Sequence, residues 1–341
     1  MKTLILGLCL SLMPAVLCAE GAGHVAGVQE GTIPAPHHGR EMEFALWYPA
    51  VQGSATASFG GNPVFRPVTV APEAEAVAGR HPLILLSHGL GGHYRSLGWL
   101  AVALAERGAV VVAVNHPEST VFDFDMQAGL RHWTRAEDLR LALDHVLADP
   151  VLGPMVDETR IAAAGFSYGS WTALTLAGVR GNLAGYRALC ATAPTGHCRD
   201  IVAQGGDLGL LEAGAWDADL ADARVDAVVA IDPGLTWGLE AADVAGLAVP
   251  ALLIQLGAGV DRLDSTDISA GGSGFAALVP QARVAEVAPA YHFSVLPLCT
   301  EKGAAILEAE GDDPVCTDPV GAVRAAIHRA VIAAVVQHLG L

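Results

Sequence analysis

The sequence predicts an α/β protein with a mostly parallel central sheet and helices on both faces. From residue 82 onward, short apolar runs rich in β-branched residues alternate with longer stretches in which apolar residues recur at helical spacing. The short runs are apolar almost throughout, as strands covered on both faces should be. Hydrophobic residues make up 52% of the 341 residues and charged residues 16%, which excludes disordered, collagen-like and coiled-coil chains.

The expected elements follow in order along the chain. Strands are expected at residues 83–87, 109–115, 160–165, 225–231, 251–256 and 283–287. Helices are expected between and after them, at residues 97–107, 135–147, 170–178 and 321–339. Ahead of these elements, residues 43–48 are expected to form an antiparallel strand at the edge of the sheet.

The first 19 residues have the form of a secretory signal peptide. Lys2 is followed by an apolar run over residues 4–18, and the small Ala19 marks the expected cleavage site. No later stretch reaches the roughly 18 uninterrupted apolar residues of a membrane-spanning helix. We therefore expect a periplasmic or secreted protein without a stable membrane anchor.

Residues 20–341 are expected to form one domain that carries an insertion at residues 181–224. This segment is rich in Gly, Asp and Ala and contains no clear strand, so it interrupts the alternation of strands and helices. Such an insertion can cover a catalytic site as a cap or decorate the surface, and the sequence leaves both open.

The charge balance excludes one class of partner. There are 36 Asp and Glu residues against 19 Lys and Arg residues, which gives a net charge of −17. Such a surface repels phosphate backbones, so binding to nucleic acid is not expected.

Four cysteines follow the leader: Cys190, Cys198, Cys299 and Cys316. An even number in an exported chain favours disulfides, and four cysteines allow about three pairings. We expect the pairing of neighbours in sequence, since each such pair brackets a turn-rich segment. A zinc site is disfavoured because no C-x-x-C motif is present.

A nucleophile is indicated by Gly165-Phe166-Ser167-Tyr168-Gly169. This G-x-S-x-G pattern follows an expected strand and opens an expected helix, which is the setting in which a sharp turn exposes a nucleophilic serine. A serine hydroxyl needs a base, and the oxyanion that forms on attack needs donors already in place. The Tyr168 amide and the Leu90 amide, in the glycine-rich loop after residues 83–87, are the candidate donors.

The base and the acid should follow the serine along the chain. Of the histidines after Ser167, His292 alone stands in a loop just past an expected strand. Two carboxylates compete to orient it. Asp232 directly follows the strand at residues 225–231, whereas Asp261 is separated from the next strand by a glycine-containing lead, so Asp232 is favoured.

These motifs resemble those of the α/β-hydrolase superfamily, and within it the bacterial dienelactone-hydrolase-like proteins grouped with platelet-activating-factor acetylhydrolases. The resemblance extends from about residue 43 to the C-terminus. It rests on Leu46-Trp47-Tyr48-Pro49, Ser87-His88-Gly89-Leu90-Gly91, the Ser167 pentapeptide, Ala230-Ile231-Asp232-Pro233 and Tyr291-His292-Phe293-Ser294.

The resemblance implies the α/β-hydrolase fold, an acid at Asp232 and a first oxyanion donor at Leu90. It also implies that Cys299 and Cys316 tie the loop behind His292. Dienelactone hydrolases proper have a cysteine nucleophile and an acid one strand later, and this chain departs from both features.

The expected function is that of a serine ester hydrolase that forms an acyl-enzyme on short-chain carboxylic esters and needs neither a metal nor an organic cofactor. Phe166, Trp237 and Phe293 are the apolar residues expected to contact a small-molecule ester. The alternatives are a thioesterase or amidase with the same triad, and a non-catalytic binding protein of the same fold.

Overall fold

The computed structural model describes residues 23–192 and 196–341, and the expected leader lies outside them. Its centre is a mixed sheet with the strand order β10-β9-β8-β7-β5-β6-β2-β1-β4-β3. The parallel part comprises β5 (His81–Ser87), β6 (Val110–Val114), β7 (Val156–Phe166), β8 (Ala227–Ile231), β9 (Ala251–Leu256) and β10 (Arg283–Val287). The expected α/β class with a mostly parallel sheet is confirmed.

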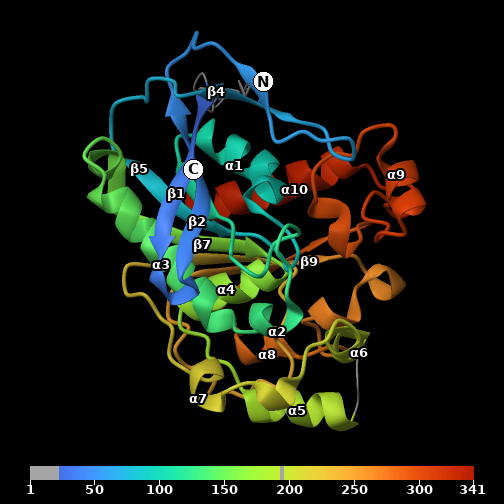
Figure 1. Cartoon of the computed structure of the whole chain (residues 1–341). Coiled ribbons are helices and arrows are strands. Elements are labelled where there is room, and N and C mark those ends of the chain that lie inside the picture. Colours follow the sequence, from blue (N-terminus) through green and yellow to red (C-terminus); the bar gives the residue numbers. More distant parts are fainter. Residues whose placement is uncertain (1–22, 193–195) are drawn as a thin grey trace, which may run out of the picture.

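Helices cover both faces of this sheet (Figure 1). One face packs against α1 (Gly98–Ala105) and α10 (Arg324–Leu339), and the other against α3 (His132–Ala148) and α4 (Tyr168–Leu176). Successive strand residues alternate between the two cores: Leu83 and Leu85 lie in one, Ile84 and Leu86 in the other. All four are at most 1% exposed, which explains why the strand reads as a continuous apolar run.

The expectation of an edge strand at residues 43–48 is wrong. These residues belong to β2 (Arg40–Ala50), which pairs antiparallel with β6 on one side and with β1 (Val25–Ala35) on the other. Beyond β1 lie β4 (Val68–Pro72) and the short β3 (Ala57–Phe59). The sequence does not predict β1, because glycines interrupt the apolar pattern of this strand.

One of those glycines makes room for an aromatic ring. Gly27 lies opposite Tyr48 in the β1–β2 register. A Cβ atom at Gly27 would lie 2.4 Å from Cε2 of Tyr48. The buried Tyr48 ring therefore fills the place of a side chain on β1, and the two strands pack as one unit.

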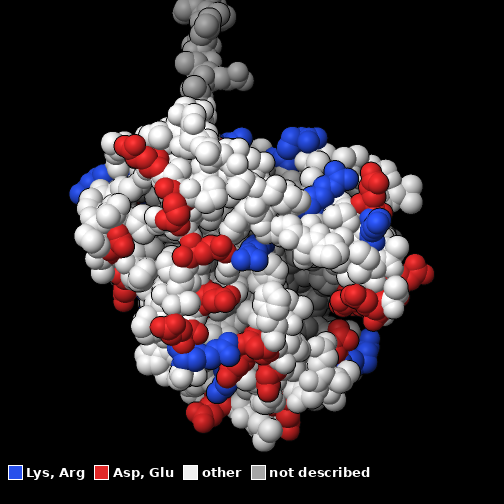
Figure 2. Space-filling model, turned by 45° about the horizontal axis from the view of Figure 1, so that its top comes forward, with Lys and Arg blue, Asp and Glu red and all other residues white. Residues whose placement is uncertain are grey.

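Between α4 and β8 the chain forms α5 (Leu183–Thr192), α6 (Gly196–Ala203) and α7 (Ala213–Trp216) instead of passing directly to the next strand. The other short helices are α2 (Met126–Gly129), α8 (Phe275–Leu278) and α9 (Gly303–Glu310). None of the described helices combines the length and apolar character needed to cross a bilayer. On the face drawn in Figure 2, acidic and basic groups are interspersed and acidic groups are the more numerous.

Gly27→Ala should destabilise the fold, because the added methyl group must displace the buried Tyr48 ring. Overpacking of this kind costs about 1–3 kcal/mol. Urea denaturation measures the change in the free energy of unfolding. Gly214→Ala is the matched control, since nothing lies within 4 Å of its added Cβ. Equal midpoints for the two variants would contradict the packing described for Gly27.

Candidate active site

Ser167 stands in a sharp turn between β7 and α4. Its backbone has φ 56° and ψ −119°, a conformation that non-glycine residues rarely adopt. The turn is tight enough that a Cβ atom at Gly165 would lie 2.2 Å from the backbone of Gly169. The Ser167 amide donates to the carbonyl of Ile231 (2.9 Å), so the strained residue is anchored to the end of β8.

His292 and Asp232 meet Ser167 from two other segments. His292 begins the short 3-10 helix η7 (His292–Val295) after β10, and its Nε2 lies 3.0 Å from Ser167 Oγ. Its Nδ1 lies 2.6 Å from Oδ2 of Asp232, which directly follows β8. The structure thus brings together the three residues that the sequence places at strand ends.

The Asp232 carboxylate is fully buried and saturated with hydrogen bonds. Oδ1 accepts from the Gln255 side chain and the Leu256 amide, both at 2.8 Å. Oδ2 accepts from the Thr266 hydroxyl at 2.8 Å, in addition to its contact with His292. Gln255 and Thr266 were not apparent from the sequence, because polar residues near strand ends carry no distinctive spacing.

Asp261, the competing acid, lies in the 3-10 helix η5 (Gly259–Asp261) and is half-buried. No hydrogen bond joins its carboxylate to His292 among the described residues. The structure therefore brings Asp232, and not Asp261, to the imidazole.

The two candidate oxyanion donors flank Ser167. Tyr168 is the first residue of α4, where an amide has no acceptor within the helix. The loop that carries Leu90 passes beside the serine, since a Cβ atom at Gly89 would lie 3.3 Å from Ser167 Cβ. Within residues 23–192 and 196–341, neither amide has a hydrogen-bond acceptor.

The aromatic residues expected to contact substrate lie in different settings. Phe166 is 3% exposed, and its ring packs 4.6 Å from that of His292. Phe293 lies on another side of the same imidazole, with ring centroids 5.2 Å apart. Trp237 is half-buried, and its indole donates to the Asp264 carbonyl at 3.2 Å. Phe166 therefore supports His292 from within the core.

Comparisons with known proteins agree with this architecture. A ferulic acid esterase from Streptomyces cinnamoneus superposes with a TM-score of 0.58 at 20% identity, over 95% of this chain and 92% of that one. A structure described as m3DLH superposes with a TM-score of 0.53 at 17% identity, over 94% of this chain and 98% of that one. The chain has the α/β-hydrolase fold.

Sequence relationships are more distant. No family model matches the chain. Lipase 1 of Moraxella sp. (strain TA144) is 28% identical over 151 residues, which are 44% of this chain. The chain spans 42% of the length of that curated relative.

Beneath the Leu90 loop, the chain holds a second Ser-His-Asp arrangement. Ser87 Oγ lies 2.8 Å from Nε2 of His116, whose Nδ1 lies 2.8 Å from Oδ2 of Asp138. All three residues are 0% exposed, so no substrate can reach Ser87. Burial, followed by the charge of Arg135, lowers the pKa of His116 to about 4. The arrangement is therefore a neutral imidazole in the core and not a second active site.

Arg135 connects this buried arrangement to the two donor segments. Its guanidinium donates to the His88 carbonyl in the loop before Leu90, to Ser119 Oγ (2.7 Å) and to Thr172 Oγ1 on α4 (3.1 Å). It also lies over the Tyr168 ring, 4.7 Å from its centroid. Burial lowers the pKa of Arg135 to about 10, which leaves it charged at neutral pH.

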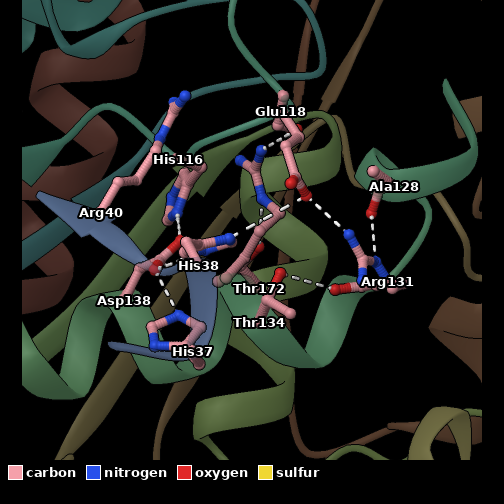
Figure 3. Close-up of polar contacts among 12 residues, drawn as sticks. His37, His38, Arg40, His116, Glu118, Ala128, Arg131, Thr134, Asp138 and Thr172 are labelled. Carbon is pink, nitrogen blue, oxygen red and sulfur yellow. Dashed lines mark hydrogen bonds and ion pairs between the residues drawn. The ribbon is translucent and has the colours of Figure 1, made fainter. Parts of the chain in front are cut away.

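Figure 3 shows the outer end of this network, where Asp138 accepts from three imidazoles. His37 and His38 direct Nε2 at Oδ1 (2.8 and 3.1 Å), and His116 approaches Oδ2. Burial alone would raise the pKa of the Asp138 carboxyl, but these hydrogen bonds outweigh it and hold the pKa well below its usual range.

His37, His38 and Asp138 are also the one group of potential metal ligands found among the described residues. Two imidazole nitrogens and a carboxylate oxygen would suit a zinc ion. The same three atoms already satisfy one another by hydrogen bonding, so the cluster is accounted for as a cross-link between the β1–β2 turn and α3.

Each of the four cysteines that the structure describes is paired with its neighbour in sequence. Cys190 is linked to Cys198, which joins α5 to α6, and Cys299 is linked to Cys316. Both links agree with the sequence-local pairing. The second also joins the segment after η7 to the loop before α10, which holds the chain around His292 on its C-terminal side.

Acid should destabilise the protein through its buried histidines, of which His132 is the clearest. Burial lowers the pKa of His132 from its ordinary 6.5 to about 3. Because the unfolded chain takes up the proton first, this stability is fully present above pH 6.5 and is lost as the pH falls toward 3. Between pH 7 and pH 5 the loss from this residue is about 2 kcal/mol, at about 1.4 kcal/mol per pKa unit.

His132→Phe keeps a ring among Trp171 and Trp216 but removes the titration. Because the hydrogen bond to the Trp216 carbonyl is lost, the variant should be less stable at pH 7, yet its stability should fall less steeply with acid. Urea denaturation at pH 7, 6 and 5 measures both effects. Parallel pH profiles for the two proteins would show that His132 is not a neutral buried group.

Proposed function

We propose that the protein is an exported serine hydrolase that cleaves short-chain carboxylic esters through an acyl-enzyme, with Ser167 as nucleophile, His292 as base and Asp232 as orienting acid. The observation that carries the proposal is the continuous hydrogen-bonded series from Ser167 Oγ through His292 to the buried Asp232 carboxylate. A metal or organic cofactor has no part in this reaction.

In the proposed mechanism, His292 Nε2 takes the Ser167 proton as Oγ attacks the ester carbonyl carbon. The Leu90 and Tyr168 amides stabilise the negative charge that develops on the carbonyl oxygen. His292 then gives its proton to the leaving alcohol, and afterwards removes a proton from the water that hydrolyses the acyl-enzyme. Asp232 fixes the imidazole tautomer and stabilises its cationic form.

Similar proteins support the ester as the scissile group. The structural neighbour from Streptomyces cinnamoneus is a ferulic acid esterase, and the curated relative from Moraxella is a lipase. Two disulfides fit an oxidising compartment, which supports export to the periplasm or the medium.

Ser167→Ala should lower kcat for p-nitrophenyl acetate by about 10⁶-fold, because it removes the nucleophile. Asp232→Asn should lower kcat by about 10⁴-fold, because it leaves the imidazole in the wrong tautomer. Initial rates with purified variants measure both losses, and labelling of the wild type with a fluorophosphonate locates the nucleophile.

Asp261→Asn is the control for the acid, and its kcat should fall by much less than that of Asp232→Asn. A larger fall in kcat for Asp261→Asn than for Asp232→Asn would assign the role of the acid to Asp261, which follows the next strand. A wild type that neither hydrolyses the ester nor reacts with the fluorophosphonate would favour the non-catalytic alternative. Faster turnover of matched thioesters or anilides than of esters would favour a thioesterase or amidase.

Arg135→Gln should lower kcat at least about tenfold while leaving KM nearly unchanged, because the proposed oxyanion donors act mainly in the transition state. Complete loss of one oxyanion donor lowers kcat by about 10²–10³-fold. Removing Arg135 would only displace the donors, so kcat should fall by less. Arg135→Lys should restore part of the rate. Arg140→Gln, on the same helix and partly exposed, controls for general effects of removing an arginine from α3. An equal fall in all three variants, or a change in KM alone, would contradict a positioning role.

A further inference from the structure

A cavity of about 290 Å³ adjoins His292. Three separate segments form it: the turn after β9, the start of η7 and the loop closed by the second disulfide. Its lining is Val260, Asp261, Arg262, Leu263, Tyr291, His292, Phe293, Pro314 and Thr317. Of the proposed catalytic groups, His292 lines it, whereas Ser167, Leu90 and Tyr168 do not.

We propose that this cavity binds the alcohol part of the ester, and that it selects uncharged, apolar alcohols about the size of an aromatic ring. The proposal rests on the proposed function, because it follows from the role of His292. The imidazole must lie within hydrogen-bond reach of the leaving oxygen in order to protonate it. A group attached to that oxygen therefore extends past His292, while the carbonyl oxygen faces the Leu90 and Tyr168 amides.

Most of the solvent-facing surface of the lining is apolar. Leu263 is 41% exposed and Val260 is fully exposed, so both side chains present apolar surface to solvent. Phe293 and Tyr291 add partly exposed aromatic surface. Covering these groups with an apolar alcohol removes apolar area from water, which is favourable by about 25 cal/mol per Å².

Charged groups in the lining do not favour an anionic alcohol. The Arg262 guanidinium is neutralised by Glu286 (2.6 Å) and Asp267 (3.3 Å). Asp261 adds a carboxylate to the lining. The cavity volume corresponds to roughly ten water molecules at about 30 Å³ each. An aryl alcohol fits this space, and methanol leaves most of it empty.

The wall that faces His292 is held in place before any ligand binds. Cys316 is bonded to Cys299. Ser294, two residues after His292, donates its hydroxyl to the Asp318 carboxylate at 2.6 Å. Arg324 pairs with the same carboxylate at 3.0 Å. The wall and the imidazole therefore form one preformed unit, which reduces the entropy lost when the alcohol is bound.

Thr317→Trp tests the proposal by filling the cavity from an exposed position. The substrates are methyl, phenyl and 2-naphthyl acetate, which share one acyl group. The variant should lower kcat/KM for 2-naphthyl acetate at least about tenfold and for methyl acetate less than twofold. Val320→Trp is the matched control, because Val320 is fully exposed and lies outside the lining. This variant should keep the wild-type order of kcat/KM among the three acetates.

The deacylation rate separates the alcohol site from an acyl site. The alcohol has left before the acetyl-enzyme reacts with water, so the deacylation rate measured after a rapid burst should be the same in Thr317→Trp and wild type. The ratio of rates for p-nitrophenyl acetate and butyrate should also stay constant. Hydrolysis of methyl acetate by the variant shows that it is folded and competent.

Two results would overturn the subsite. A change in deacylation and in the acetate-to-butyrate ratio would assign the cavity to the acyl chain, and equal losses on all three acetates would show that the cavity does not select the alcohol. By contrast, a wild type that cleaves none of these esters and leaves Ser167 unlabelled would overturn the proposed function itself, and the subsite with it.

Discussion

The buried carboxylate of Asp232 is the constraint on which the rest of the site depends. Removing an ion from water costs several kcal/mol unless its oxygens are fully hydrogen-bonded. Here Gln255 and the Leu256 amide bind one oxygen, and Thr266 and His292 bind the other. These donors come from the end of β9, from the 3-10 helix η6 (Asp264–Thr266) and from η7. Stabilising the charge therefore fixes three segments relative to one another. With Nδ1 directed at Asp232, Nε2 faces the Ser167 hydroxyl, as the proposed mechanism requires.

The two Ser-His-Asp arrangements show that the same set of contacts can lie in very different surroundings. Ser87, His116 and Asp138 repeat the contacts of Ser167, His292 and Asp232 at similar distances. The difference is environment. Ser87 is the last residue of the strand β5, is wholly buried and accepts a hydrogen bond from Arg135, which draws electron density away from its oxygen. Ser167 stands in a strained turn beside two amides that have no hydrogen-bond acceptor among the described residues.

The sequence was most informative where chemistry and chain geometry impose a fixed spacing. The parallel strands were predicted to within a few residues, because burial on both faces leaves a continuous apolar run in strands such as β9. The bounds of β10 also agree with the prediction, although this strand lies at the edge of the sheet and is largely exposed. Ser167 and Asp232 could be proposed from the sequence because each directly follows a strand, and His292 because it lies in the loop just past β10. Thr266, Arg135 and Asp138 could not be found, since their contacts span segments far apart in the chain. The sequence does not reveal β1, because the Tyr48 ring of the paired strand occupies the space that a side chain at position 27 would fill.

The insertion after α4 can now be related to the site through the same carboxylate. In the part of the chain that the structure describes, α6 packs against η6, and Thr266 of η6 donates to Asp232. Cys190 and Cys198 join α6 to α5 across the residues that are not described. A segment packed in this way is linked through η6 to the carboxylate of the candidate acid. Because α6 supports η6 and η6 supports Asp232, changes in residues 181–224 should affect the proposed chemistry through the orientation of His292.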